Sequence, residues 1–403
     1  MSNHPKRRRA IALTSAGLLA VGAFAVTTSS ALADPANSDE NPTAEVLGIE
    51  HPEKIDGKYL VSLSSELSTT NLGHLLEDYD ATVTSEWGSF NAFATELTYA
   101  EAQQLAADPL VEYVQQDAVV ETQEEGTQTD PPSWGLDRID QVDLPLDDEF
   151  TYANTASDVT IHVLDTGVNL NHNEFDGRLV EGFDAIDEGG DADDCQGHGT
   201  HVAGTAAGTE FGVAKEAKIA PIRVLDCGGT GSYEGIIEGI NWVTENAEGP
   251  TVANMSLGGP SDQAVDDAVS AAIDSGVTVI AASGNDATDA CNYSPASVES
   301  AITVNNSNID DGQSNTSNYG SCTDLYAPGS DITSAWIDGD DAEYTDSGTS
   351  MAAPHVAGAA AIYLQENPEA TPAEVKDHLL ETATEDAITN PGPDTPNLLL
   401  FHG

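Results

Sequence analysis

Five short, nearly continuous apolar segments that alternate with helical segments restrict the fold of this sequence more than any other feature. Strands buried on both faces of a parallel sheet have this pattern, because polar residues do not alternate with the apolar ones. The apolar segments are Val159–Leu164, Ile219–Leu225, Val252–Met255, Val277–Ala282 and Ala301–Val304, and the helical ones are His198–Gly208, Tyr233–Asn246, Ala264–Ser275, Ser350–Gln365 and Pro372–Thr382. The alternation predicts an α/β fold with a doubly wound, mostly parallel sheet over residues 127–403.

A smaller pattern precedes this one, in residues 58–126. We predict three strands and two helices there, and the second helix begins with a capping box formed by Thr98 and Glu101. The strands are Tyr59–Leu63, Phe90–Leu97 and Val111–Val120, and the helices are Thr69–Tyr79 and the segment that starts at Thr98. This order of elements predicts a small α+β domain of the ferredoxin-like, split βαβ kind.

The N-terminus has the composition of a secretory signal peptide. Lys6 and Arg7–Arg9 precede the apolar stretch Ala10–Val26, and Ala31–Ala33 supplies small residues for cleavage. We therefore predict a signal peptide at 1–33 and a polar, proline-containing linker at 34–57. The same reading predicts a secreted, extracellular protein with no membrane attachment after the signal is removed.

Acidic residues dominate the charge of the chain. The sequence has 69 Asp and Glu against 12 Lys and Arg, a net charge of −57. Such a chain repels nucleic acid phosphates and anionic membranes, which excludes both as partners. Salt screens the self-repulsion, so we expect a halotolerant protein whose stability holds or rises with added salt. The acidic run Asp187–Asp194 is expected to be a solvated loop.

A serine lies at the predicted start of a helix made of very small residues. Ser350 follows a Gly-Thr turn and precedes a run of Ala and Gly that continues to Ala361. In the first turn the backbone N–H groups have no partner within the helix, and the helix dipole adds positive potential. Both features stabilise an oxyanion beside the hydroxyl, so Ser350 is a candidate nucleophile. The alternative is a serine that only caps an alanine-rich helix.

A serine nucleophile needs a base within reach and a carboxylate that orients the base. Asp165 follows a predicted buried strand, and His198 stands between two glycines at a predicted helix start. Active sites of doubly wound sheets lie beyond the carboxyl ends of the strands, and both Asp165 and Asn285 are placed there. The chain order Asp165, His198, Ser350 is one of the known orders of a Ser-His-Asp triad.

Two other functions stay open from the residues alone. Asp165–Gly167 and Asp346–Gly348 are Asp-Thr-Gly and Asp-Ser-Gly, the signatures of an aspartic protease whose two carboxylates share a proton. Aspartic proteases of the pepsin type are almost wholly β, which the predicted α/β alternation opposes. The other possibility is a pseudoprotease that binds peptides without cleaving them, which the undamaged motifs oppose.

Three motifs resemble the signatures of the subtilisin-like serine proteases, peptidase family S8. They are Asp165–Gly167, His198–Gly204 and Gly348–His355. The stretch Trp134–Leu400 is similar to the proteinase K branch, and within it to the aqualysin-like secreted enzymes. Residues 58–121 resemble the family's propeptide, an intramolecular inhibitor and folding chaperone. The resemblance implies a monomeric secreted endopeptidase that acts on proteins and peptides. It also implies a zymogen whose propeptide is removed autocatalytically near residues 125 and 126.

The resemblance also implies a role for individual residues. Asp165, His198 and Ser350 form the triad, and the Asn285 amide with the Ser350 N–H forms the oxyanion hole. A substrate strand would lie between two extended segments, above a pocket for an apolar or aromatic P1 side chain. The implied substrate-binding residues are Gly229, Thr230, Gly231, Tyr233, Ser256, Leu257, Gly258, Ala282, Ser283 and Gly284.

Four cysteines in a secreted chain predict two disulfides, and counting alone leaves three pairings open. The aqualysin-like resemblance implies the pairs Cys195–Cys227 and Cys291–Cys322.

Structural calcium at two places, and no cofactor for catalysis, are further implications of the resemblance. Carboxylate and carbonyl oxygens are the ligands that Ca²⁺ prefers. One set consists of Asp324 and the backbone carbonyls of Glu299 and Ala301, and the other of Asp137, Asp140, Gln141 and Asp147.

Overall fold

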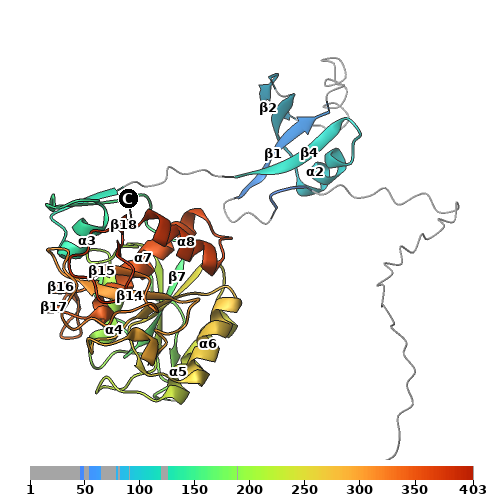
Figure 1. Cartoon of the computed structure of the whole chain (residues 1–403). Coiled ribbons are helices and arrows are strands. Elements are labelled where there is room, and N and C mark those ends of the chain that lie inside the picture. The colour runs from blue at the N-terminus through green and yellow to red at the C-terminus, as the bar shows by residue number, and fades with distance from the viewer. Residues whose placement is uncertain are drawn as a thin grey trace, which may run out of the picture. The chain divides into compact units, whose positions relative to one another are not determined.

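The computed structural model describes residues 46–49, 54–64, 79, 82–89, 91–118, 126–187 and 189–402 (Figure 1). The chain divides into two compact units, Met1–Glu121 and Thr122–Gly403, and each is described by itself. The predicted signal peptide and most of the predicted helix Thr69–Tyr79 lie outside the described residues. Within those residues, we find no helix with the length and apolar character needed to span a bilayer.

The first unit contains an antiparallel sheet of four strands in the order β2-β3-β1-β4. Its elements are β1 (Lys54–Leu63), β2 (Thr82–Trp87), β3 (Ala92–Glu96), α2 (Tyr99–Ala106) and β4 (Val111–Ala118). Thr98 and Glu101 form the predicted capping box at the start of α2. Strand β2 was not predicted, because none of its residues is fully buried and it carries no hydrophobic pattern.

Part of the predicted linker 34–57 belongs to this unit instead. Residues 54–57 form the beginning of β1, and Val46 is only 2% exposed. Leu47 exchanges backbone hydrogen bonds with β4, from its N–H to Val114 and from the N–H of Gln116 to its carbonyl, each 2.9 Å long. The polar, proline-containing composition of this segment did not reveal these contacts, and both Val46 and Ile49 pack against the core of the unit.

The second unit contains a sheet of nine strands within the described residues. Their order is β18 (Thr384–Glu385), β19 (Leu398–Leu399), β15 (Leu325–Pro328), β14 (Ile302–Ser307), β12 (Thr278–Ala282), β10 (Thr251–Met255), β7 (Thr160–Asp165), β9 (Lys218–Arg223) and β8 (Phe183–Asp184). All neighbouring pairs are parallel except β18 with β19. The predicted α/β fold with a mostly parallel sheet is therefore confirmed.

Helices and three small strand pairs complete this unit. The helices are α3 (Trp134–Ile139), η1 (Asn173–Phe175), α4 (His198–Ala207), α5 (Tyr233–Asn246), α6 (Gln263–Asp274), η2 (Ala290–Asn292), α7 (Thr349–Glu366) and α8 (Pro372–Thr382). The pairs are β5 (Gly126–Thr129) with β6 (Glu149–Tyr152), β11 (Gly259–Pro260) with β13 (Tyr293–Ser294), and β16 (Ile332–Ala335) with β17 (Glu343–Asp346). Gly126, predicted as the last residue of the smaller domain, thus begins a strand of the second unit.

The sheet separates two apolar clusters. On β7, Ile161 and Val163 belong to one cluster and Leu164 to the other, because successive residues of a strand point to opposite faces. Helices α4, α7 and α8 contribute to the first cluster, and α5 and α6 to the second (Figure 1). Both faces are covered, which explains the unbroken apolar character of the strands.

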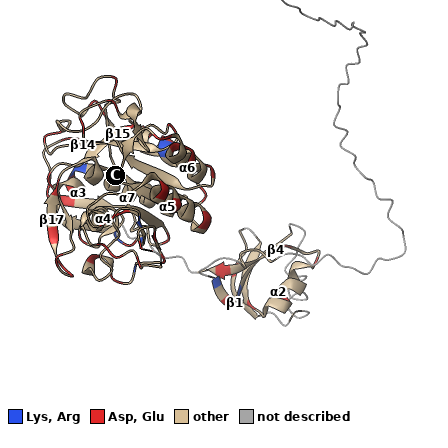
Figure 2. Ribbon diagram, turned by 90° about the horizontal axis from the view of Figure 1, so that it is seen from below, with Lys and Arg blue, Asp and Glu red and all other residues tan. Residues whose placement is uncertain are grey.

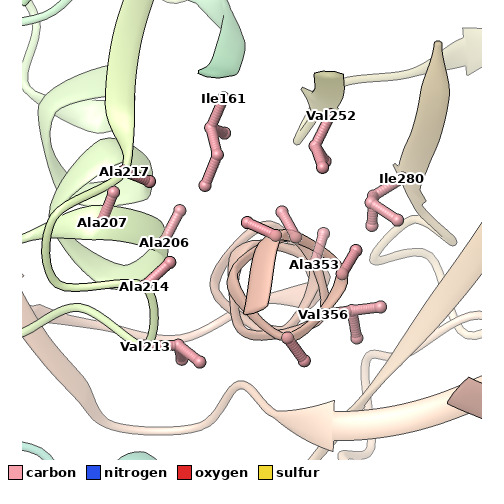
Figure 3. Packing of buried hydrophobic residues seen from close by; sticks show 14 of the residues in the cluster. Ile161, Ala206, Ala207, Val213, Ala214, Ala217, Val252, Ile280, Ala353 and Val356 are labelled. Carbon is pink, nitrogen blue, oxygen red and sulfur yellow. The ribbon is translucent and has the colours of Figure 1, made fainter. Parts of the chain in front are cut away.

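Helix α7 lies in the middle of the first cluster and is buried over almost its whole length. Figure 3 shows it end-on between the sheet and the α4 region, with Ala353 and Val356 packed among their neighbours. A Cβ atom on Gly358 would lie 2.5 Å from that of Val213, so even alanine does not fit there. The small residues of the Ser350 stretch therefore let α7 enter the core.

Acidic residues are spread over many elements of both units, whereas basic residues occur at few places (Figure 2). In the described residues the negative charge is thus distributed along the chain rather than gathered in one segment.

Candidate active site

The last residue of β7 and the first residue of α4 form a carboxylate–imidazole pair. His198 Nδ1 lies 2.7 Å from Asp165 Oδ1. Asp165 is fully buried, and the same oxygen accepts the N–H of Thr166 at 2.8 Å. A carboxylate at this place holds the imidazole in the tautomer whose Nε2 is free to accept a proton.

Opposing effects act on the pKa of His198. Burial lowers this pKa, whereas the charge of Asp165 and the hydrogen bond to it raise the pKa. The charges of Asp346 and Asp194 raise it further, and the net pKa lies above the ordinary value of 6.5. The His198 side chain is still 23% exposed, so the ring can meet a substrate.

Asp194 builds the start of α4, a role that the sequence analysis missed. One of its oxygens accepts the N–H groups of Gln196 and Gly197, at 2.8 and 3.0 Å. The other accepts the N–H and the hydroxyl of Thr200, at 3.0 and 2.6 Å. Asp194 is only 8% exposed, so the expected solvated loop is wrong at this residue. A carboxylate just before a helix was the available signal, because it satisfies free N–H groups of the first turn.

Glycine at position 197 allows the chain to enter α4. Its φ of +111° lies in the left-handed region, and an added Cβ would lie 2.5 Å from the ring of Trp336. Only glycine adopts this conformation without strain, so the residue directly before His198 is constrained by backbone geometry.

Ser350 is the second residue of α7, and its backbone and side chain both contact Ser256. The Ser350 hydroxyl donates to the carbonyl oxygen of Ser256 at 3.2 Å, and the Ser256 hydroxyl donates to the carbonyl of Ser350 at 2.8 Å. His198 and Ser350 line one pocket of about 840 Å³. In the described part of the chain no hydrogen bond joins their side chains, so the hydroxyl points to Ser256 rather than to the expected base. Such contacts often tighten only when substrate binds.

Asn285 follows β12 and is oriented by the start of α7. Its Oδ1 accepts the N–H and the hydroxyl of Thr349, at 2.9 and 3.2 Å. This leaves the amide nitrogen Nδ2 as the group free to donate. The loop is braced by Asn318, which donates to the carbonyl of Ser283 at 2.8 Å and accepts the N–H of Asp286 at 3.0 Å. Asn318 is fully buried, and the sequence alone gave no sign of its role.

The predicted substrate-binding residues lie around two adjoining pockets. Gly229, Thr230, Gly231, Tyr233, Ser256, Leu257 and Gly258 line the larger pocket with His198 and Ser350. Leu257, Ala282, Ser283, Gly284 and Asn285 line a pocket of about 230 Å³ that also includes Ser350. Asp286 and Tyr293 line this smaller pocket too and were not predicted.

The carboxyl groups of the two motifs of the aspartic protease alternative have different hydrogen-bond partners. The Asp165 carboxylate contacts His198, and Asp346 Oδ1 accepts the N–H of Ser347 at 2.7 Å. Within the described residues no hydrogen bond connects the two carboxyl groups, as a shared proton would require.

Comparison with known proteins agrees with this geometry. Residues 156–397 match the subtilase family, Peptidase S8, and residues 28–123 match the peptidase inhibitor I9 family. The chain belongs to the subtilase family. The expected serine protease class and inhibitor-type propeptide are thereby confirmed, and the aspartic and non-catalytic alternatives find no support.

Similar proteins carry related names. This subtilase is 46% identical to an extracellular serine proteinase of Thermus sp., over 89% of this chain and 92% of the relative. It is 48% identical to alkaline serine exoprotease A of Vibrio alginolyticus, over 75% of this chain and 57% of the relative. The crystal structure of a cold-adapted subtilisin-like serine proteinase is 52% identical and has a TM-score of 0.65. The match covers 67% of this chain and 98% of that one.

Both disulfides implied by the resemblance are present in this subtilase. Cys195 pairs with Cys227, and Cys291 with Cys322, and the described residues contain no free cysteine. The sequence separations are 32 and 31 residues, for which chain entropy gives about 3–4 kcal/mol of stabilisation each. The first bridge connects the segment before α4 to the loop that carries Gly229.

In the first predicted calcium site, a lysine ammonium group lies where the metal ion would bind. Asp324 Oδ1 and the carbonyl oxygens of Glu299 and Ala301 all accept hydrogen bonds from the ammonium group of Lys376. The distances are 2.7–2.8 Å, so a cation already lies among the predicted ligands. These contacts do not support the prediction of calcium at Asp324, Glu299 and Ala301, because a lysine distant in sequence places its positive charge among the same three oxygens.

The second predicted set includes a buried carboxylate oxygen without a hydrogen-bond partner. Asp137 accepts the N–H groups of Asp147 and Asp148, and the Gln141 amide donates to two backbone carbonyls. Asp140 Oδ1 is buried and has no hydrogen-bond partner among the described residues. Burial, with the nearby charges of Asp147 and Asp137, raises the pKa of Asp140 to about 6. In the described residues no three His, Cys, Asp or Glu side chains are gathered to hold a metal.

Proposed function

We propose that this subtilase is a secreted serine endopeptidase that cleaves peptide bonds through an acyl-enzyme. The observation that carries the proposal is the 2.7 Å contact of His198 with Asp165, in a pocket that also contains Ser350. Secretion is supported by the basic and apolar N-terminus and by the names of the relatives from Thermus and Vibrio. A monomer stays a prediction.

The reaction begins when the Ser350 hydroxyl turns from Ser256 towards His198. Nε2 of His198 takes the hydroxyl proton while Oγ attacks the substrate carbonyl carbon. Asp165 stabilises the imidazolium that forms. The imidazolium then gives its proton to the leaving amine, and the C–N bond breaks. Water, deprotonated by the same nitrogen, attacks the ester, and Ser350 recovers its proton.

The oxyanion of each tetrahedral intermediate would accept hydrogen bonds from Asn285 Nδ2 and from the Ser350 N–H. The latter lies in the first turn of α7, where the helix offers no acceptor. The substrate would lie as an added strand between residues 229–231 and 256–258, held through its main chain. Leu257, Ala282 and Gly284 supply the apolar part of the lining of the smaller pocket, and we propose that this part favours an apolar or aromatic P1 side chain.

The region that matches the I9 family supports synthesis as a zymogen. We propose that it inhibits the enzyme until the chain cleaves itself near residues 125 and 126. Residue 125 lies outside the described residues, and Gly126 begins β5. The limits of the predicted domains, 58–126 and 127–403, stay predictions.

A structural calcium ion is proposed for the N-terminal position of the catalytic domain only. The unpartnered, buried Oδ1 of Asp140 supports it, with Asp147 as the neighbouring carboxylate. The ion would neutralise these charges and would not take part in catalysis.

Inhibitor profiling tests the proposed class of enzyme. A serine-directed sulfonyl fluoride is expected to abolish casein hydrolysis by the secreted protein, because the activated Ser350 hydroxyl attacks its sulfur, displaces fluoride and is left as an unreactive sulfonate ester. Pepstatin is expected to have no effect, since the two Asp-Xaa-Gly motifs do not share a proton. Inhibition by pepstatin alone would contradict the proposal, and a secreted form that hydrolyses no casein would favour the pseudoprotease.

The raised pKa of His198 predicts the acidic limb of the activity profile. The base acts in its neutral form, so kcat/KM should rise with pH through a midpoint above 6.5, measured with a peptide substrate. Asp346→Asn removes one charge that raises this pKa and keeps an acceptor for Ser347. We expect it to lower the midpoint by less than about one pH unit with an unchanged plateau. An unmoved or higher midpoint in this variant contradicts the electrostatic explanation.

A further inference from the structure

Lys376 on α8 reaches across to the loop before β14 and ends among three oxygens. Its ammonium group lies 2.8 Å from the carbonyl of Glu299, 2.7 Å from that of Ala301 and 2.8 Å from Asp324 Oδ1. The side chains of Lys376 and Asp324 are only 17% and 18% exposed. This is a directed contact of a largely buried cation, unlike a typical surface ion pair.

All three N–H donors of the Lys376 ammonium group are used in this cluster. An ammonium group has three N–H donors, and each has one of the three oxygens as its acceptor. The second oxygen of Asp324 accepts the N–H of Thr303 at 2.8 Å. Burial raises the pKa of Asp324, and the charge of Lys376 and the two hydrogen bonds lower it. Both oxygens of Asp324 therefore already accept a hydrogen bond, and the position between the three oxygens is taken by the ammonium nitrogen.

We propose that Lys376 serves as a built-in cation that takes the place of a metal ion among Asp324, Glu299 and Ala301. Calcium requires six to eight oxygens at about 2.3–2.6 Å, and the ammonium nitrogen occupies the point on which these three converge. The positive charge is covalently attached, so neither dilution nor a chelator removes it. The same residue fastens α8 to the segment before β14 and to the start of β15, next to Cys322.

The proposal predicts that removing the lysine side chain creates a metal site. Without the ammonium group, the carboxylate and two carbonyls would face a space open to water and to a hydrated cation. Lys376→Ala should then bind one more calcium ion per chain than its parent. Asp324→Asn should leave the calcium content of the parent unchanged, because the parent holds no metal there.

The experiment counts bound calcium by equilibrium dialysis in the full chain carrying Ser350→Ala, which prevents self-digestion. About 5 mM Ca²⁺ exceeds the dissociation constants of roughly 10⁻⁴–10⁻³ M of many extracellular calcium sites. The arms are the parent, Asp324→Asn, Lys376→Ala and the double variant, in which the additional ion should be lost. Lys218→Ala is the matched control, since Lys218 is exposed and its side chain has no described partner. Asp140→Asn identifies any ion at the N-terminal position.

Thermal unfolding gives a second measurement. In EDTA, Lys376→Ala should lower the Tm by at least about 3 °C, and calcium should restore part of the loss in this variant but not in Lys218→Ala. The proposal is overturned if folded Lys376→Ala binds no additional calcium. It is equally overturned if Asp324→Asn removes a calcium ion from the parent, a comparison that does not require the lysine variant to fold. None of these measurements depends on the enzymatic activity proposed above.

Discussion

Replacing Ser350 by alanine is expected to reduce kcat by roughly 10⁶-fold, a size taken from subtilisin, another member of the family. The variant loses the atom that attacks the substrate, while the start of α7 keeps its backbone and its glycine N-cap. Only one hydroxyl contact, to the carbonyl of Ser256, disappears from the structure. The variant should therefore lose catalytic activity while it stays folded, which circular dichroism and the Tm can verify.

The same variant should accumulate as the unprocessed proform, because the protein removes its own propeptide in the proposed scheme. Gel electrophoresis and N-terminal sequencing of the secreted material measure this. Ser347→Ala is a matched control, since Ser347 is an exposed serine three residues away whose hydroxyl contacts Asp331. It should be processed and active within a few-fold of the parent. Efficient self-cleavage by purified Ser350→Ala would refute autocatalysis.

The pattern of apolar residues predicts much of the fold, because a strand that is buried on both faces is apolar along nearly its whole length. The apolar segments predict β7, β10 and β12 to within one residue at each end. Strand β14 extends three residues beyond its predicted end, at Ser307, because Asn305 and Asn306 are polar yet fully buried. Asn305 finds its partner in Thr323, 18 positions away, and no local pattern could reveal that contact.

The residues of the candidate site likewise fall into those that the sequence predicts and those that it does not. Asp165, His198, Asn285 and Ser350 are predictable because each stands in a recognisable motif at the end of a strand or the start of a helix. Asn318 and Lys376 are not, since each acts on residues tens of positions distant and stands in no motif. Lys376 shows the consequence most clearly. Every predicted calcium ligand at Asp324 is present in the sequence, but one lysine 52 positions later in the chain places its ammonium group among them.

Asn285→Ala is expected to lower kcat by about 10²–10³-fold, a figure known from the corresponding residue of subtilisin, with little change in KM. The amide would donate to an oxygen that carries negative charge only in the transition state, so ground-state binding should hardly depend on it. Steady-state kinetics on a soluble peptide substrate separate the two constants.

Asn285→Asp sharpens this test, because the Oδ1 of Asn285 has a structural role and its Nδ2 is the proposed catalytic donor. Aspartate retains an oxygen that can accept the N–H and hydroxyl of Thr349, now contacts of 2.9 and 3.2 Å. In place of the Nδ2 donor it puts a second carboxylate oxygen, which repels the oxyanion. If Asn285 acts as the donor, the aspartate variant must be slower than the alanine variant, with a similar Tm. If Asn285 only supports the start of α7, aspartate should preserve activity better than alanine, and the assignment to the oxyanion hole would be wrong.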